Sequence, residues 1–198
     1  MKSVCRSGRG ARVRRALELG CALGFALTVL LTAAAWRYQY LCRRVCGDTL
    51  RLHIVANSDS TADQLQKLAV RDALLEAVAA ITAQAQNRDE AVAAVSRALP
   101  WLQAEARSAA GGQPVQVRLT ESDFPARDYG AFRLPAGRYA ALRVELGQAE
   151  GHNWFCVLYP ALCVGASSAD YGDAAENALV FGRYELRSAL LDSLCALF

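Results

Sequence analysis

The sequence predicts an α+β domain that follows an apolar N-terminal helix. Three observations support this fold class: 18 consecutive residues without charge near the N-terminus, a strand pattern followed by two to three amphipathic helices, and then several further strand patterns. A length of 198 residues fits one domain with an appendage. We therefore expect a basic flank over residues 1–18, an apolar leader over 19–36, a juxtamembrane segment over 37–47 and a single domain over 48–198.

The apolar leader over residues 19–36 is long enough to cross a bilayer. As a helix it would extend about 27 Å, close to the thickness of the hydrocarbon core. Because the preceding flank is rich in arginine, we expect the N-terminus to stay in the cytoplasm and the domain to be extracytoplasmic. Two interpretations remain open. Small residues at 33–35 would suit a cleaved signal peptide, whereas the length of the run favours an uncleaved anchor.

The charge of the domain argues against nucleic-acid binding. Residues 1–44 contain nine basic residues and one acidic residue, which leaves 13 basic and 18 acidic residues in the rest of the chain. A nucleic-acid partner would require a clustered basic surface on the folded domain. We expect no such partner.

The first elements of the domain follow from local patterns. Residues 50–55 alternate and predict a strand. The polar cluster at residues 57–60 then suits a turn and a helix cap better than a cation site or a partner loop. Thr61, with Gln64 three residues later, predicts a capping box and a helix over residues 61–84.

A second helical section begins with cap residues at 87–90 and ends at the glycine pair 111–112. Pro100 predicts a kink or a restart, because proline removes a helical hydrogen bond. A restart would bury Trp101, Leu102 and Ala106 on one side.

The second half of the domain predicts an antiparallel sheet and a closing helix. Residues 115–119 and 139–146 alternate between apolar and polar side chains, as half-buried strands do. The apolar run 154–159 is typical of an interior strand. Apolar residues at helical spacing predict a C-terminal helix over 179–198.

The cysteines suggest a disulfide and give little support to a metal site. Of seven cysteines, five follow the leader, where disulfides persist once a chain is exported. Cys156 and Cys163 are the candidate pair, with Pro160 between them to turn the chain. Cys42 and Cys46 have the spacing of metal ligands, but no second ligand pair accompanies them, so we expect neither metal nor cofactor.

Catalytic patterns are weak. His152 and Cys156 are four residues apart, which places them about 13 Å apart on a strand, too far for a thiol–imidazole pair unless the segment bends. The sequence has no GxSxG elbow and no glycine-rich phosphate loop. We therefore predict that the chain is not an enzyme and has no small-molecule substrate, although a thiol-dependent enzyme of the cell envelope remains the alternative.

Several motifs together resemble the stage II sporulation protein R family. Residues 50–60 read LRLHIVANSDS, close to the opening strand and turn of that family, and the next helix follows its DQxxKxxVRD pattern. Further along, the chain follows the family's order of short motifs, with FP at residues 124–125, YG at 129–130, LPAGRY at 134–139 and ALRV at 141–144. The segment GHNWFCVLYPALC at residues 151–163 is also similar to the family's sequence. Two departures are small: Phe155 replaces a usual second Trp, and Ala161 a common second Pro. The likeness covers about residues 48–164.

The resemblance implies a signalling role in endospore formation. Members of the family are exported from the forespore into the intermembrane space, or stay anchored in its membrane. There they activate a membrane-embedded aspartic protease of the mother cell, which processes a sigma-factor precursor. The loops between the second and third strands are then candidate partner contacts, because binding residues concentrate on loops. The candidates are Phe124, Tyr129, Phe132 and Arg138. A structural tether of the envelope is a further alternative.

Overall fold

The computed structural model describes residues 7–162, 171 and 173–182. The chain forms two compact units, residues 1–40 and residues 41–198. The long helix α1 (Ser7–Gly47) begins in the first unit and ends in the second.

The first unit consists of the apolar part of α1. Large apolar side chains between Val13 and Trp36 are exposed. Within the described residues, α1 is the one helix long and apolar enough to cross a membrane, although a signal sequence would have the same length and composition. An exposed apolar surface of this extent is unfavourable in water and favourable in lipid.

The last turns of α1 belong to the folded body. Cys42, Val45 and Cys46 are buried there, and Gly137 lies so close to Cys46 that an added Cβ would be 2.5 Å from the sulfur. The segment expected to be a juxtamembrane connection over residues 37–47 is therefore helical, and its end contributes side chains to the core.

A four-stranded mixed sheet forms the centre of the body, in the order β2-β5-β1-β6. Its strands are β1 (Leu50–Val55), β2 (Val115–Phe124), β5 (Gly137–Leu146) and β6 (Asn153–Tyr159). The prediction of an antiparallel sheet is wrong for one pair, because β1 and β5 run parallel. The chain leaves β1 through two helices, and the antiparallel pair β2–β5 then turns it back beside β1 in the same direction.

The apolar segment 154–159 does not form an interior strand. β6 lies at one edge of the sheet and pairs with β1 alone among the described strands. The interior strands are β5 and β1, and β1 is buried along its whole length.

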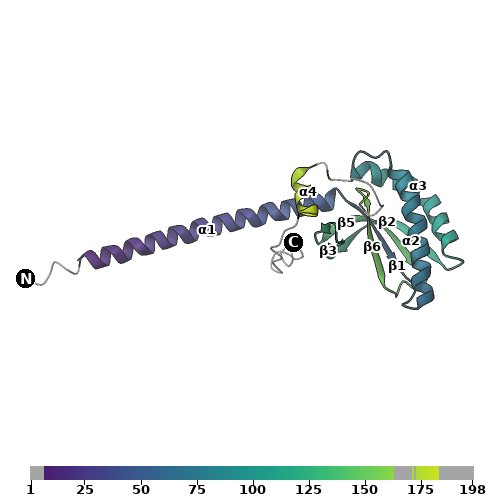
Figure 1. The fold of residues 1–198 in the computed structure, drawn as a ribbon, viewed down its shortest axis with the longest axis horizontal. Coiled ribbons are helices and arrows are strands. Elements are labelled where there is room, and N and C mark those ends of the chain that lie inside the picture. The colour runs from purple at the N-terminus through teal and green to yellow at the C-terminus, as the bar shows by residue number, and fades with distance from the viewer. Residues whose placement is uncertain (1–6, 163–170, 172, 183–198) are drawn as a thin grey trace, which may run out of the picture. The chain divides into compact units, whose positions relative to one another are not determined.

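Two long helices, α2 (Thr61–Thr82) and α3 (Arg88–Ala109), cover one face of the sheet (Figure 1). The main core lies between them and the strands, and Leu52 of β1, Leu142 of β5 and Leu74 of α2 are fully buried in it. On a strand, alternate side chains face opposite sides, so the odd-numbered residues of β1 face away from these helices.

Two details of the helices differ from expectation. Ser60, and not Thr61, is the N-cap of α2, and its hydroxyl accepts a hydrogen bond from the backbone N–H of Asp63. The helix α3 continues through Pro100 without a restart. Pro100 is exposed, so water can satisfy the carbonyl that loses its donor. As a result Trp101 is half exposed, whereas Leu102 and Ala106 are buried as predicted.

Among the described residues, those that cover the opposite face of the sheet lie at one of its ends. A short ribbon of β3 (Arg127–Asp128) and β4 (Arg133–Leu134) lies there, as does α4 (Ala174–Phe181). Figure 1 shows both on the side of the sheet away from α3. The prediction of a C-terminal helix over residues 179–198 is wrong in its bounds, because α4 begins at Ala174 and ends at Phe181, where Gly182 is an extended C-cap. The rest of that predicted helix, residues 183–198, lies outside the described residues.

Candidate functional site

The motif residues gather in two clusters, one at the end of the sheet and one on its face. The first joins the loop after β1 to the turn between β5 and β6. Gly151 donates its backbone N–H to the Ala56 carbonyl at 2.9 Å, and Glu150 donates to Asn57 at 3.2 Å. Gly151 is so close to this loop that an added Cβ would be 2.6 Å from the carbonyl carbon of Ser58.

Asp63 is the acceptor at the centre of this first cluster. Ser58 and Asn57 donate to one of its carboxylate oxygens, and Gln113 donates to the other at 3.0 Å. These hydrogen bonds, Ser58 first, lower the pKa of Asp63 to about 2. The hydroxyl of Ser58 thus donates its hydrogen to Asp63.

Lys67 and Asp59 attach the other side of the loop to the start of β6. Lys67 is buried, which lowers its pKa, and its ammonium donates to the His152 carbonyl at 2.9 Å. Asp59 accepts from the backbone N–H of His152 at 2.6 Å and also contacts the imidazole Nδ1. These bonds hold two loops together. The cap expected within residues 57–60 is confirmed at Ser60.

The second cluster surrounds Arg51, on the face of β1 that points away from α2 and α3. Arg51 is fully buried, with its guanidinium carbon 4.0 Å from the ring centre of Phe124 and 4.9 Å from that of Tyr139. Its Nη2 donates to the Tyr129 hydroxyl at 2.6 Å. Among the described residues, Nε and Nη1 of Arg51 have no hydrogen-bond partner. A buried guanidinium held by aromatic rings fixes the ribbon above it to the sheet.

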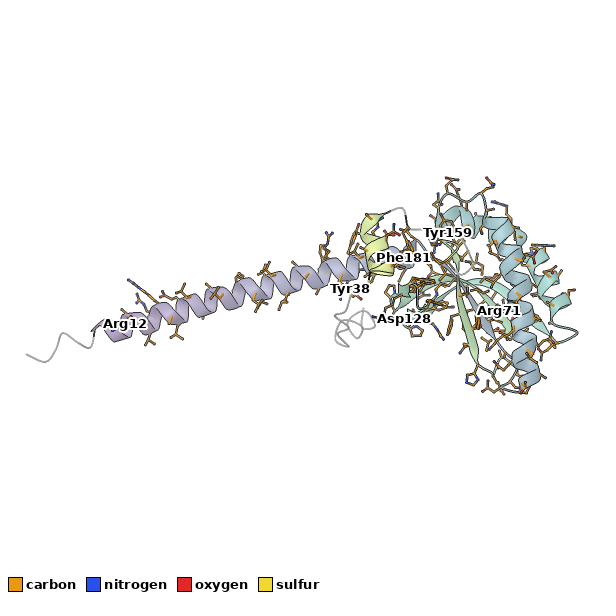
Figure 2. All side chains as sticks on the ribbon, in the orientation of Figure 1. Arg12, Tyr38, Arg71, Asp128, Tyr159 and Phe181 are labelled. Carbon is orange, nitrogen blue, oxygen red and sulfur yellow. The ribbon has the colours of Figure 1, made fainter. Side chains whose placement is uncertain are left out.

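Beyond the ribbon the sheet presents a polar surface, which we call the open face. Arg118 of β2 and Arg143 of β5 are paired in register, and each places a nitrogen 2.8 Å from the same oxygen of Glu145. The open face comprises Arg118, Thr120, Arg143, Glu145, Asn153 and Phe155. Its charged side chains are between 18% and 45% exposed. In Figure 2 Asp128 of β3 lies on this side of the sheet, away from the two long helices.

His53 packs beneath two residues of the open face, Asn153 and Phe155. It is buried, donates to or accepts from Asn153 at 2.8 Å, and lies 4.7 Å from the ring of Phe155. Burial lowers the pKa of His53, so the imidazole is neutral at neutral pH. Arg127 of the ribbon covers the Phe155 ring at 5.1 Å.

The four candidate partner contacts occupy different environments. Phe124 and Phe132 are buried, the former against Arg51 and the latter stacked on Tyr129 at 4.7 Å. Tyr129 is half-buried. Arg138 is exposed and pairs with Glu121 at 3.1 Å. Tyr129 thus stacks on Phe132 and bonds Arg51, which in turn lies over Phe124. Contact of the four candidates with a partner stays a prediction.

Sequence reasoning missed Arg51, and with it the arginines of the open face. The alternation of β1 held the signal, because Arg51 and His53 occupy the side of the strand opposite Leu50, Leu52 and Ile54. Full burial of an arginine on that side was not deducible without knowing that the ribbon covers it.

The predicted bridge between Cys156 and Cys163 stays a prediction, because residue 163 lies outside the described residues. Cys156 is buried on the side of β6 that faces the helices, in the main core. A catalytic thiol must reach its substrate, so this position gives no support to a thiol-dependent enzyme. Within the described residues no group of three or more His, Cys, Asp or Glu side chains could hold a metal ion.

Comparison with known proteins identifies relatives of the body. The family model for stage II sporulation protein R matches residues 47–169. A curated relative, stage II sporulation protein R of Bacillus subtilis (strain 168), is 36% identical over 118 residues, which is 58% of this chain and 53% of the relative. The match thus spans about half the length of that relative. No solved structure matches.

Proposed function

The chain belongs to the stage II sporulation protein R family, and from this premise we propose that it is an exported signalling protein of endospore formation. It binds a membrane-embedded aspartic protease of the mother cell and activates it, so that the protease processes a sigma-factor precursor. The observation that carries the proposal is the family match over residues 47–169, which covers nearly the whole described body.

The N-terminal helix supports export. Its apolar segment fits either a membrane anchor or a signal sequence, and in both cases the body crosses the forespore membrane. The body then lies in the space between the forespore and the mother cell, where it can reach a protease whose outer region faces the same space.

Activation proceeds by binding. A ligand shifts a conformational equilibrium only by its difference in affinity for the two states, so the body must bind the active arrangement of the protease more tightly than the inactive one. Two features favour a binding role over catalysis by the body itself. The clustered motif residues hold loops and the ribbon in place, and the thiol of Cys156 lies in the core.

The test is reconstitution in a bacterium that does not sporulate. The chain, the protease and the sigma-factor precursor are produced together, and precursor and product are quantified by immunoblot. Processing is expected with the full chain and not without it. Equal processing in the absence of the chain would refute the proposal, as would cleavage of the precursor by the purified chain without the protease.

A further inference from the structure

The open face is the part of the sheet that no described element covers. The helices α2 and α3 occupy one face, and the ribbon with α4 occupies one end of the other. The uncovered part of this face consists of rows of side chains that run across neighbouring strands. Arg118, Arg143 and Phe155 lie on one such row, with the buried His53 in register between Arg143 and Phe155.

The charge of this surface is opposite to that of the body as a whole, because Arg118 and Arg143 exceed Glu145 by one positive charge, whereas residues 45–198 contain 13 basic and 18 acidic residues. Two arginines, Arg118 and Arg143, share one carboxylate oxygen of Glu145 at 2.8 Å each. At the ribbon edge Arg127 adds a third guanidinium, above the ring of Phe155, and Asp128 of the same strand adds a second carboxylate. His53 below is neutral, so the excess positive charge comes from arginines and does not depend on pH near neutrality.

Several side chains of the open face have a fixed geometry in the unbound protein. Glu145 fixes the two arginines that it bonds. The ring of Phe155 lies 4.7 Å from His53 and 5.3 Å from Phe124, so it is supported by buried rings. Arginine and aromatic residues are the side chains that most often dominate binding energy, and a fixed geometry reduces the entropy lost on binding.

We infer that the open face docks an acidic segment of the outward-facing region of the protease, with carboxylates on Arg118 and Arg143 and an apolar side chain on Phe155. This inference rests on the proposed function and adds to it the surface used and the chemistry of the partner. A protein carboxylate fits because the planar guanidinium forms two parallel hydrogen bonds with it. Adjacent strands hold the two arginines side by side, so neighbouring acidic residues could bind both.

The test compares two double charge reversals in the full chain. Arg118→Glu with Arg143→Glu alters the open face, and Arg97→Glu with Arg107→Glu makes the same charge change on exposed positions of α3. At matched protein levels in the reconstituted system, the open-face variant is expected to lower processing about tenfold or more, and the α3 variant less than about twofold. Because Glu145 loses its partners in the first variant, Arg118→Gln alone serves as a milder change. It is expected to lower processing several-fold with an unaltered thermal unfolding midpoint.

Crosslinking identifies the occupant directly. A photoreactive phenylalanine analogue is placed at Thr120 on the open face, or at Arg97 on α3 as the control, and the adduct is identified by mass spectrometry. We expect an adduct with an Asp- or Glu-rich segment of the protease at Thr120 and none at Arg97. An adduct with residues 183–198 of the same chain, with a second copy or with lipid would overturn the inference.

The two proposals fail in different ways. If the wild-type chain does not stimulate processing, the proposed function is wrong and this inference falls with it. If the wild-type chain stimulates processing and the open-face variants do so equally well, the docking surface alone is wrong. Equal losses in the open-face and α3 variants would likewise refute the open face and leave the signalling role intact.

Discussion

Replacement of Gly151 by alanine tests whether the contact between the two loops stabilises the body. An added Cβ would lie 2.6 Å from the carbonyl carbon of Ser58 and 2.9 Å from the Cβ of Ala56, closer than real Cβ atoms approach. Since Ser58 contributes backbone atoms, the clash cannot be relieved by rotating a side chain. The loop after β1 and the turn before β6 must therefore move apart.

The magnitude follows from the bonds that this movement breaks. Two backbone hydrogen bonds join the segments, at 2.9 and 3.2 Å, and each contributes about 0.5–1.5 kcal/mol. Strain from the extra methyl group costs about 1–3 kcal/mol when relaxation is incomplete. If the segments move apart, the strain falls but the hydrogen bonds are lost, so the two costs do not add in full. We expect Gly151→Ala to lower the free energy of unfolding by about 2–4 kcal/mol.

Urea unfolding of the full chain in detergent, followed by tryptophan fluorescence, measures this loss. With a urea slope of about 2 kcal/mol per molar, the midpoint should fall by about 1–2 M. The matched control is Gly47→Ala, where an added Cβ meets nothing within 4 Å, and its midpoint should be unchanged or slightly higher. A Gly151→Ala midpoint equal to that of the wild type would refute the reasoning.

Three further predictions concern β2, α4 and the cysteines. Gln103→Ala removes two hydrogen bonds at 2.8 and 2.9 Å from α3 to the outer edge of β2, and should lower the free energy of unfolding by about 1–3 kcal/mol in the same urea assay. Burial first, and nearby carboxylates next, raise the pKa of Glu176 from 4.5 to about 7, despite Arg44 at 2.8 Å. The stability contributed by protonated Glu176 is thus fully present below pH 4.5 and lost as the pH rises through about 7, and Glu176→Gln should flatten this part of a pH–stability curve. Peptide mapping of the exported protein without reduction should recover Cys156 linked to Cys163, and separate peptides would contradict that pairing.

Much of the fold was accessible from local pattern. The strand β1 has the predicted bounds, because its alternation ends at residues that bond their own backbone. The helix α2 was predicted within two residues of its end, since apolar residues at helical spacing need no tertiary information. The cap at Asn87 was also confirmed, with its side chain accepting from the backbone N–H of Glu90 at 2.9 Å.

The errors arose where a local pattern has two tertiary solutions. A continuous apolar run indicates that both faces of a strand are covered, but it does not show whether the strand pairs with one neighbouring strand or with two. In β6 the side chain of Cys156 lies in the core under the helices, and that of Val157 packs with residues of the ribbon on the opposite face. Both faces of the strand are therefore covered, although the strand lies at the edge of the sheet. The parallel pairing of β1 with β5 likewise depends on the path of the chain between them.

The candidate site was less accessible because charged residues at alternate strand positions are normally solvent-facing. Arg51 is instead fully buried, since Phe124, Tyr139 and Tyr129 come from β2, β5 and the segment between them and enclose it. The sequence around Phe124 and Phe132 predicted that both lie on loops and contact a partner. In the fold Phe124 packs against Arg51, and Phe132 stacks on Tyr129.

The central claim is that the body acts after crossing the forespore membrane. The most direct measurement is the fraction of sigma-factor precursor processed in a sporulating strain that lacks its own copy and produces either the full chain or a chain without residues 1–36, at equal levels in the forespore. Processing is expected to be restored by the full chain and to be absent with the leaderless chain. Equal restoration by the leaderless chain, shown by fractionation to remain in the forespore cytosol, would contradict the central claim.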